Sequence, residues 1–335
     1  MIRFIIRRLG ALIALFFGMI VVMFLLTHVI PADPARIAVG PQATQQSVDA
    51  MRHKMGLDKP LIVQMGIYVW GVLHLNFGNS VYDGQPVFHE IMQYAPATIE
   101  LAIVATVLSV AFGLAMGILS AVYQNSIVDS SMRVFAIIGR AIAPFWLAIL
   151  LQIVFFGRLN WFPSGTQLSL SLSPPTKITG MYLVDSLITL NWQVFFNSFH
   201  HIVLPAVALG LGGIADTSRM MRATMLIELR REYPRTARAK GLSEWSVQLR
   251  HVVRNAINPV VTVIGIRFGY LLAGTILIEA IFQWPGLGRY ALLAIENLDF
   301  PALIGVTLFV VVAFAIVNLF VDILYGYLDP RIRYA

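Results

Sequence analysis

The chain has 335 residues, of which 58% are hydrophobic and only 12% are charged, and its mean hydropathy is +0.76. Soluble domains carry about 25% charged residues, so this composition excludes a soluble globular protein and predicts several membrane-spanning helices. The net charge of +7 would suggest nucleic-acid binding in a soluble protein, but here the basic residues flank apolar segments, where they set membrane orientation. Because cysteine is absent, disulfides, thiolate metal sites and cysteine nucleophiles are excluded.

The first two predicted units are a membrane helix and an extramembrane subdomain. Residues 1–30 begin with Arg3, Arg7 and Arg8, and residues 9–30 form an almost unbroken apolar segment. This segment can span a hydrocarbon core of about 30 Å and is too long for the apolar core of a secretory signal peptide. Residues 31–96 have a soluble-type composition, with short helices predicted over 49–55 and 62–73. Apolar residues recur throughout 31–96, which predicts a compact subdomain rather than a linker.

The remaining residues, 97–335, predict five further spans and therefore an all-α polytopic membrane protein with six transmembrane helices. The spans are expected over 98–123, 133–157, 203–215, 257–282 and 302–327. Pro144 interrupts the third span, and the fourth is short, which leaves open its continuation past Asp216. The second span carries Gly113-x-x-x-Gly117 and the fifth carries the same spacing at residues 265–269, which allows neighbouring helices to approach closely.

The distribution of Lys and Arg predicts the orientation. Fifteen of them lie on the side of the N-terminal tail and seven lie on the opposite side. Because basic residues are enriched in cytoplasmic loops, both termini are expected in the cytoplasm and residues 31–96 outside it.

The loop between the fourth and fifth spans, residues 218–258, is the most basic stretch, with nine Lys or Arg residues and three acids. The positions of its helix-starting and helix-ending residues predict two short helices joined by a tight turn. Pro234 suits a first helical position, Gly241 is placed to end that helix, and Ser243 can cap the second with Glu244 in its first turn. A solvated loop whose charge only sets topology is the alternative interpretation.

The second short helix is expected to carry one apolar stripe and to end before the fifth span. The stripe follows helical spacing, and Asn258-Pro259 is expected to stop the helix. The stripe consists of Trp245, Leu249, Val252 and Ala256.

Other motifs offer little chemistry. The glycines at 210, 212 and 213 lie inside an apolar run, and GxxxxGK[ST] does not occur, so helix packing explains them better than a nucleotide site. Seven histidines are present without an HExxH pattern, which favours loop or interface positions over a metal site. We therefore expect no catalytic residues, no metal and no cofactor in this chain.

Ionisable residues at membrane depth are candidates for a substrate path, because such residues face a protein interior or water. Arg140 and Arg267 are the candidates for this path. Three acids, Glu100, Asp216 and Asp322, lie near predicted span ends, where an interfacial position suffices.

Residues 279–288, EAIFQWPGLG, combine a span end, an aromatic residue and a Pro-Gly turn. This combination predicts a re-entrant or capping turn at the outer interface. The candidate outer-mouth or gate residues are Glu279, Trp284, Pro285, Gly286 and Gly288.

Several of these stretches resemble the permease subunits of binding-protein-dependent ABC importers, in the dipeptide, oligopeptide and nickel branch. TARAKGL at 236–242 with RNAINPVVT at 254–262 resembles the cytoplasmic coupling motif, and 279–288 resembles the E-x-IF-x-WPGLG signature. IPADPAR, MGLDKPL, LNFGNS and the tail LDPRIRY are also similar to family segments. Thr236 stands where more distant importers have glutamate, and Pro234 replaces a more common aliphatic residue. The long loop after the third span resembles dipeptide-type permeases.

The resemblance implies a type I ABC importer transmembrane domain in the bacterial inner membrane, which imports dipeptides or short peptides. Nickel-chelate, glutathione or opine-like substrates are alternatives within the family, and an ion-coupled secondary transporter is the alternative from another class. Implied partners are a second homologous permease, one or two ATPase subunits that hold ATP and Mg, a periplasmic or lipoprotein binding protein and membrane lipid, with no nucleic acid. The implied ATPase-docking residues are Arg235, Thr236, Ala237, Arg238, Ala239, Lys240, Gly241 and Leu242.

Overall fold

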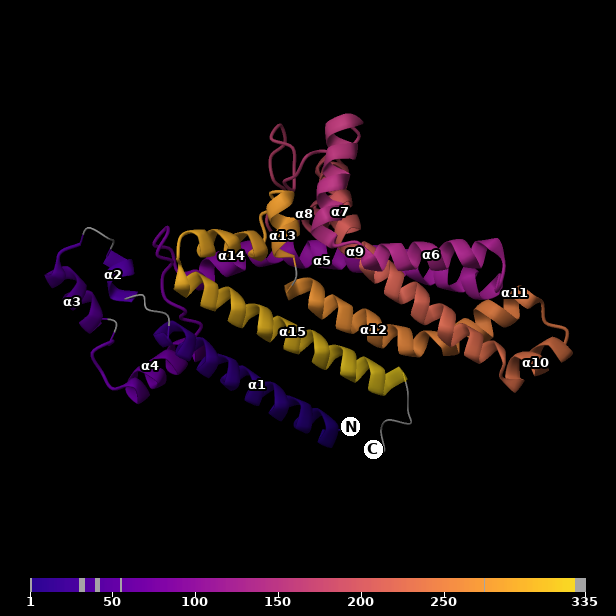
Figure 1. Ribbon diagram of the computed structural model, residues 1–335, viewed down its shortest axis with the longest axis horizontal. Coiled ribbons are helices and arrows are strands. Elements are labelled where there is room, and N and C mark those ends of the chain that lie inside the picture. The colour runs from indigo at the N-terminus through magenta and orange to yellow at the C-terminus, as the bar shows by residue number, and fades with distance from the viewer. Residues whose placement is uncertain (1, 30–33, 40–42, 55, 274, 329–335) are drawn as a thin grey trace.

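The computed structural model describes residues 2–29, 34–39, 43–54, 56–273 and 275–328, and within these ranges the chain forms helices and a single isolated β-bridge. The prediction of an all-α protein is confirmed. Figure 1 shows that α2 (Pro34–Val39), α3 (Gln45–Lys54) and α4 (Leu61–Leu73) lie at one end of the long axis, and α10 (Glu232–Ala239) and α11 (Glu244–Ser246) lie at the other. The two short helices predicted between residues 49 and 73 correspond to α3 and α4. The tail LDPRIRY lies almost entirely outside the described residues.

Among the described residues, four helices are long and apolar enough to cross a membrane. They are α5 (Val87–Val122), α9 (Trp192–Leu229), the continuous helix Glu244–Leu272 and the segment Phe300–Val321 of α15 (Phe300–Leu328). The pair formed by α6 (Ile127–Ala141) and Pro144–Arg158 is bent by 102° and counts as a fifth if it is one span. The first helix, α1 (Ile2–Val29), contains the shorter apolar stretch Gly10–Leu25. Six spans stays a prediction.

The third and fourth predicted spans differ from the helices in the structure. Pro144 does not merely interrupt the third one, because it begins α7 (Pro144–Leu151), a helix that projects sideways from the bundle in Figure 1 and continues into η1 (Gln152–Arg158). A proline at the first helical position has no backbone N–H to leave unpaired, so it starts this helix easily. The fourth span does continue past Asp216, since α9 has 38 residues and ends at Leu229.

The fifth predicted span is divided, and the loop after it is partly helical. The span comprises α12 (Val253–Ala273) and α13 (Ile276–Ile281), and the predicted loop 283–301 contains α14 (Leu287–Glu296). The prediction that Pro259 ends a helix is wrong, because Pro259 lies inside α12. Ala256 and Val260 on either side of it are buried, and this packing offsets the backbone hydrogen bond that a proline removes.

The centre of the bundle is the crossing of α5 and α9, and small residues make it close. A Cβ added at Gly113 would lie 2.6 Å from Cβ of Thr217, and one at Gly117 would lie 2.6 Å from Cβ of Met221. Both distances are too short for real carbon atoms, so only glycine permits this contact. Gly269 in α12 approaches Phe314 of α15 in the same way, at 2.8 Å. The close approach predicted from both glycine pairs is confirmed.

Candidate functional site

The basic loop folds as a compact knob, residues 230–252, at the end of α9. The prediction that Pro234 is the first residue of a helix is wrong. The first helix of the knob, α10, begins after Arg231, so Pro234 is its third residue. This position is still tolerated because the first four N–H groups of a helix have no partner within it. Gly241 follows the helix with φ +79°, and its N–H donates to the carbonyl of Arg238 at 2.9 Å. The predicted left-handed glycine at the end of the helix is confirmed.

The two sides of α10 have different surroundings. Pro234 and Ala237 are buried, and Ala237 packs in a cluster with Met225 and Val252. Ala237 therefore contacts the interior of this chain, and the exposed surface consists of the other predicted docking residues. These are Arg235, Thr236, Arg238, Ala239, Lys240, Gly241 and Leu242.

The second helix of the knob is capped as predicted but buries a different face. The side chain of Ser243 accepts a hydrogen bond from the N–H of Ser246, and Glu244 in the first turn pairs with Arg238 across the knob at 2.7 Å. The next turn, η2 (Val247–Val252), is π-helical. A π-helical turn contains an extra residue and shifts the helical register, so the predicted single stripe is wrong. Of its four residues, Val252 and Ala256 are buried, whereas Trp245 and Leu249 are exposed.

A buried ion pair joins the knob end of α9 to α6. Asp129 is fully buried, and Arg222 donates to both of its carboxylate oxygens at 2.8 Å. Ser120 of α5 donates to the same carboxylate at 2.5 Å. The sequence did not predict this ion pair, because Arg222 was interpreted only as one of the nine basic residues of the loop 218–258. The spacing of Ser126 and Asp129, a capping pattern, could have indicated that Ser126 caps a helix with Asp129 in its first turn.

A second polar contact, the charge cluster, consists of Asp216 and three arginines from three helices. Arg219 donates to Oδ1 of Asp216 at 2.6 Å, Arg140 of α6 approaches the same oxygen at 3.5 Å, and Arg267 of α12 pairs with Oδ2. Arg140 and Arg267, the two predicted path residues, therefore meet at one carboxylate. Asp216 lies roughly 20 Å along α9 from Leu229 at 1.5 Å per residue, so the helix continues well past it, and its interfacial position stays a prediction.

The predicted outer-mouth residues form a buried contact, the outer clasp, between α5 and the α13–α14 turn. Glu279 is fully buried and accepts from the hydroxyl of Thr98 at 2.7 Å and from the N–H of Arg289 at 3.0 Å. The indole N–H of Trp284 donates to the carbonyl of Ala97 at 2.9 Å. The clasp thus fixes α14 onto α5 rather than presenting these side chains to solvent.

The glycines of the turn are required by this packing. Gly286 is extended, at φ −115° and ψ −179°, so its conformation is open to any residue. A Cβ there would nevertheless collide with the Glu279 carboxylate and with the Thr98 hydroxyl, and a Cβ at Gly288 would lie 2.6 Å from Cα of Ile276. Pro285 beside them is half-buried.

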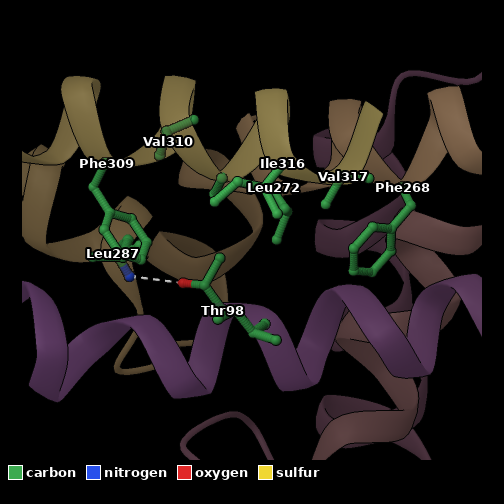
Figure 2. A pocket seen from close by; sticks show the side chains of 10 residues that line it. Thr98, Phe268, Leu272, Leu287, Phe309, Val310, Ile316 and Val317 are labelled. Atoms are coloured by element: carbon green, nitrogen blue, oxygen red, sulfur yellow. Dashed lines mark hydrogen bonds between the residues drawn. The ribbon is translucent and has the colours of Figure 1, made fainter. Parts of the chain in front are cut away.

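An apolar pocket of about 220 Å³ lies beside the outer clasp, between α5, α12, α14 and α15. Figure 2 shows Phe268, Leu272 and Phe309 around it and the hydrogen bond from the N–H of Leu287 to Thr98 at its wall. Pockets for drug-sized ligands measure about 300–1,000 Å³, so this one is smaller than a typical ligand pocket.

The glycines at 210 and 213 and the histidines at 200 and 201 make packing contacts and hydrogen bonds within the chain. Gly210 and Gly213 pack against Ser109 of α5, as the helix-packing interpretation predicts. His201 and His200 hold the loop after η1, through the carbonyls of Gly165 at 2.8 Å and Trp161 at 2.7 Å. The described part of the chain contains no group of three or more His, Cys, Asp or Glu residues that could hold a metal ion.

Comparisons with known proteins match the whole chain. Residues 113–334 match the family described as binding-protein-dependent transport system inner membrane component, and residues 1–102 match the N-terminal family of the same systems. The chain is 41% identical to the probable D,D-dipeptide transport system permease protein DdpB of Escherichia coli K12, over 97% of this chain and 96% of that protein. It is 39% identical to the dipeptide transport system permease protein DppB of Alkalihalophilus pseudofirmus, over 100% of both chains.

Two further similarities are more distant. The glutathione transport system permease protein GsiC of Escherichia coli K12 is 36% identical over 100% of both chains. A solved structure of the MetNI methionine ABC transporter in an inward-facing conformation aligns with a TM-score of 0.51 and 14% identity. The alignment covers 70% of this chain and 93% of the other. At this identity the structural similarity supports the fold alone.

Proposed function

Because the chain belongs to the family of binding-protein-dependent transport system inner membrane components, we propose that it is one transmembrane subunit of an ATP-driven importer for dipeptides or short peptides. It would form half of the translocation path, with a second, homologous permease forming the other half. The relatives named as dipeptide permeases match the full length of the chain at 39–41% identity, and this supports the peptide substrate.

The observation that carries the proposal is the knob. Its exposed face is basic and contains the small residues Ala239 and Gly241, which leave room for a partner surface. The buried face of α10 is fixed to α9 and η2 by Met225, Ala237 and Val252. A partner that grips the exposed face therefore moves a rigid unit joined directly to the long helices α9 and α12.

The proposed mechanism follows from this attachment. ATP and Mg would be held by one or two ATPase subunits docked on the knob, and this chain would contribute no catalytic residue. Closure of the ATPases would displace the knob, shift α9 and α12, and open the path toward a periplasmic or lipid-anchored binding protein. The proposed location is the bacterial inner membrane, with both termini and the knob in the cytoplasm.

Tryptophan substitution at Ala239 tests the docking. Ala239→Trp adds a large side chain to the exposed face, so it should abolish both peptide uptake and co-purification of the ATPase while leaving the amount of inserted permease unchanged. Leu170→Trp is the control, because Leu170 is fully exposed in the loop after η1 and lies outside the knob. Normal uptake and ATPase retention by Ala239→Trp would contradict docking at this surface.

The alternatives differ in substrate or energy source. Glutathione deserves a direct comparison because one full-length relative is named a glutathione permease. Competition of unlabelled glutathione, nickel chelates or opines against uptake of a labelled dipeptide separates these substrates. An ion-coupled secondary transporter would retain uptake without any ATPase subunit, whereas the proposed importer would lose it.

A further inference from the structure

The charge cluster carries more positive charge than its internal pairing uses. Three guanidinium groups surround one carboxylate, so Arg140, Arg219, Arg267 and Asp216 together have a net charge of about +2. The cluster follows directly on the apolar run 203–215 of α9, at the side of that run toward the knob. A charged group that borders an apolar span faces water or protein rather than lipid tails, so this face of the bundle borders an aqueous path or a partner.

The arginines also have donors to spare. An arginine has five N–H donors and a carboxylate about four acceptor positions, so the cluster offers about fifteen donors against about four acceptors. The side chains of Arg140, Arg219 and Arg267 are 56%, 53% and 31% exposed, whereas that of Asp216 is 15% exposed. The donors that Asp216 leaves unused therefore face outward.

Access from the interior of the bundle is closed. The crevice that Arg267 helps to line has a volume of about 20 Å³, and Thr106, Ser109 and Thr217 are among its other lining residues. This volume holds about one water molecule and no part of a peptide. A ligand of the cluster must approach from the exposed side, where the three arginines converge.

We propose that the charge cluster is a transient binding site for the carboxylate of a transported peptide, which competes with Asp216 for the three arginines. The proposal rests on the proposed function, because it assigns a substrate group to a site in the same path. Guanidinium groups match carboxylates in a two-point geometry, and Asp216 already holds at least Arg219 and Arg267 in place before the substrate arrives. Asp216 also keeps the site weak, since an entering carboxylate must displace it.

The site is assembled from three helices, and this favours release. Arg140 is on α6, Arg219 and Asp216 are on α9, and Arg267 is on α12. A shift of α12 relative to α9 removes Arg267 from the set and leaves fewer donors for the bound carboxylate. Binding and release are therefore linked to helix movement without any change of protonation.

Cysteine labelling tests the electrostatics of the site in the whole importer, reconstituted in nanodiscs with its partner subunits. A cysteine replaces Tyr270, an exposed residue one turn from Arg267, in a chain that otherwise has none. Its reaction rates with methanethiosulfonates bearing a sulfonate or a trimethylammonium group are compared. A unit charge ~10 Å away in an effective dielectric of ~40 changes each rate about fourfold in opposite directions, so Arg267→Gln should lower the ratio about sixteenfold. Arg158→Gln, at the exposed last residue of η1, should leave the ratio unchanged.

Protection by substrate identifies the ligand. A dipeptide with a free C-terminal carboxylate should slow modification about threefold at twice its dissociation constant, and its C-terminal amide should not. Arg267→Gln should remove the protection. Should Tyr270→Cys fail to assemble, Ala141→Cys beside Arg140 provides the same measurement at an exposed position.

Three results would overturn the proposal. They are equal protection by the acid and the amide, protection by anionic lipid alone, and a rate ratio insensitive to Arg267→Gln in an importer that still takes up the dipeptide. An assembled importer that takes up no peptide contradicts the proposed function instead, and the rate ratio would still report whether the cluster attracts anions.

Discussion

Truncation of the buried pair between Asp129 and Arg222 should strongly destabilise the end of the bundle that carries the knob. Removal of one partner from a buried pair costs about 3–5 kcal/mol because the remaining charge has no counterion. The Arg222 side chain is 21% exposed and regains part of its hydration, so we expect a value near the lower limit, about 3 kcal/mol, for Asp129→Ala.

The double variant separates the pair from its surroundings. Arg222→Met leaves the buried Asp129 carboxylate with only the longer contact to Arg133, at 3.5 Å, whereas Asp129→Ala with Arg222→Met leaves neither charge of the pair. The double variant should therefore cost about 1–3 kcal/mol less than the sum of the two single variants. The measurement is the thermal unfolding of the purified importer at constant detergent and lipid, followed by tryptophan fluorescence.

The exposed pair of Arg238 and Glu244 is the matched control. Its side chains are 40% and 61% exposed, and exposed ion pairs contribute about 0–1 kcal/mol. The same cycle with Arg238→Met and Glu244→Ala should show almost no coupling. Additive effects at the buried pair, equal to those of this control, would refute the assignment of Asp129 and Arg222 as the contact that fixes α6 to α9.

Three further predictions concern orientation, the outer clasp and the outer loop. A cysteine at Asn79 should react with an impermeant thiol reagent from outside, and one at Ser243 only after permeabilisation; the reverse would contradict the orientation. Gly286→Val should cost about 1–3 kcal/mol through its collision with the buried clasp and impair uptake but not ATPase retention, whereas Gly212→Ala, whose Cβ would meet nothing within 4 Å, should be neutral. Burial alone would raise the pKa of the Asp185 carboxyl, but hydrogen bonds from the Thr179 side chain and neighbouring backbone N–H groups outweigh it and lower the pKa below 3.8. The loop 173–181 should therefore keep its protease resistance as pH falls from 8 to about 4 and lose it only below that, while Asp185→Asn should weaken these charge-assisted bonds by about 1–3 kcal/mol and speed cleavage at neutral pH.

Features that depend on local geometry were predictable from the sequence. Gly241 follows a short polar helix and precedes a capping serine, so its left-handed conformation could be predicted from neighbouring residues alone. Gly113 and Gly117 are four residues apart in an apolar helix, which indicates a close helix contact whatever the partner.

Features that depend on the partner helix were not predictable. The role of Asp216 requires that Arg140 and Arg267, on two other helices, point at the same place, and no spacing along the chain encodes this. The π-helical turn at residues 247–252 changed which residues of the second knob helix are buried, and only packing against α9 shows it. The division of the fifth span was missed because residues 276–281 are as apolar as a membrane helix while their Glu279 is fixed to α5.

The contacts of α6 and α12 with α9 differ in a way that matters for transmission from the knob. α6 is attached to α9 at both of its ends, by Asp129 with Arg222 near the knob and by Arg140 with Asp216 further along, and Gly139 packs on Leu211 beyond the second pair. α12 contacts α9 through Arg267 at Asp216 and through Ala256 and Val260, which pack in one cluster with Met221 and Met225, while Gly265 and Gly269 pack on α15.

A displacement of the knob therefore carries α6 and α9 together, because separating them would break two ion pairs and a close helix contact. At the charge cluster, a shift of α12 breaks one salt bridge and leaves Asp216 still paired with Arg140 and Arg219. The carboxylate proposed to bind the charge cluster would lie on the boundary between α9 and α12. Movement of the knob would thus change its binding site first at Arg267, which is why Arg267, rather than Arg140, is the residue whose substitution distinguishes a substrate site from a structural ion pair.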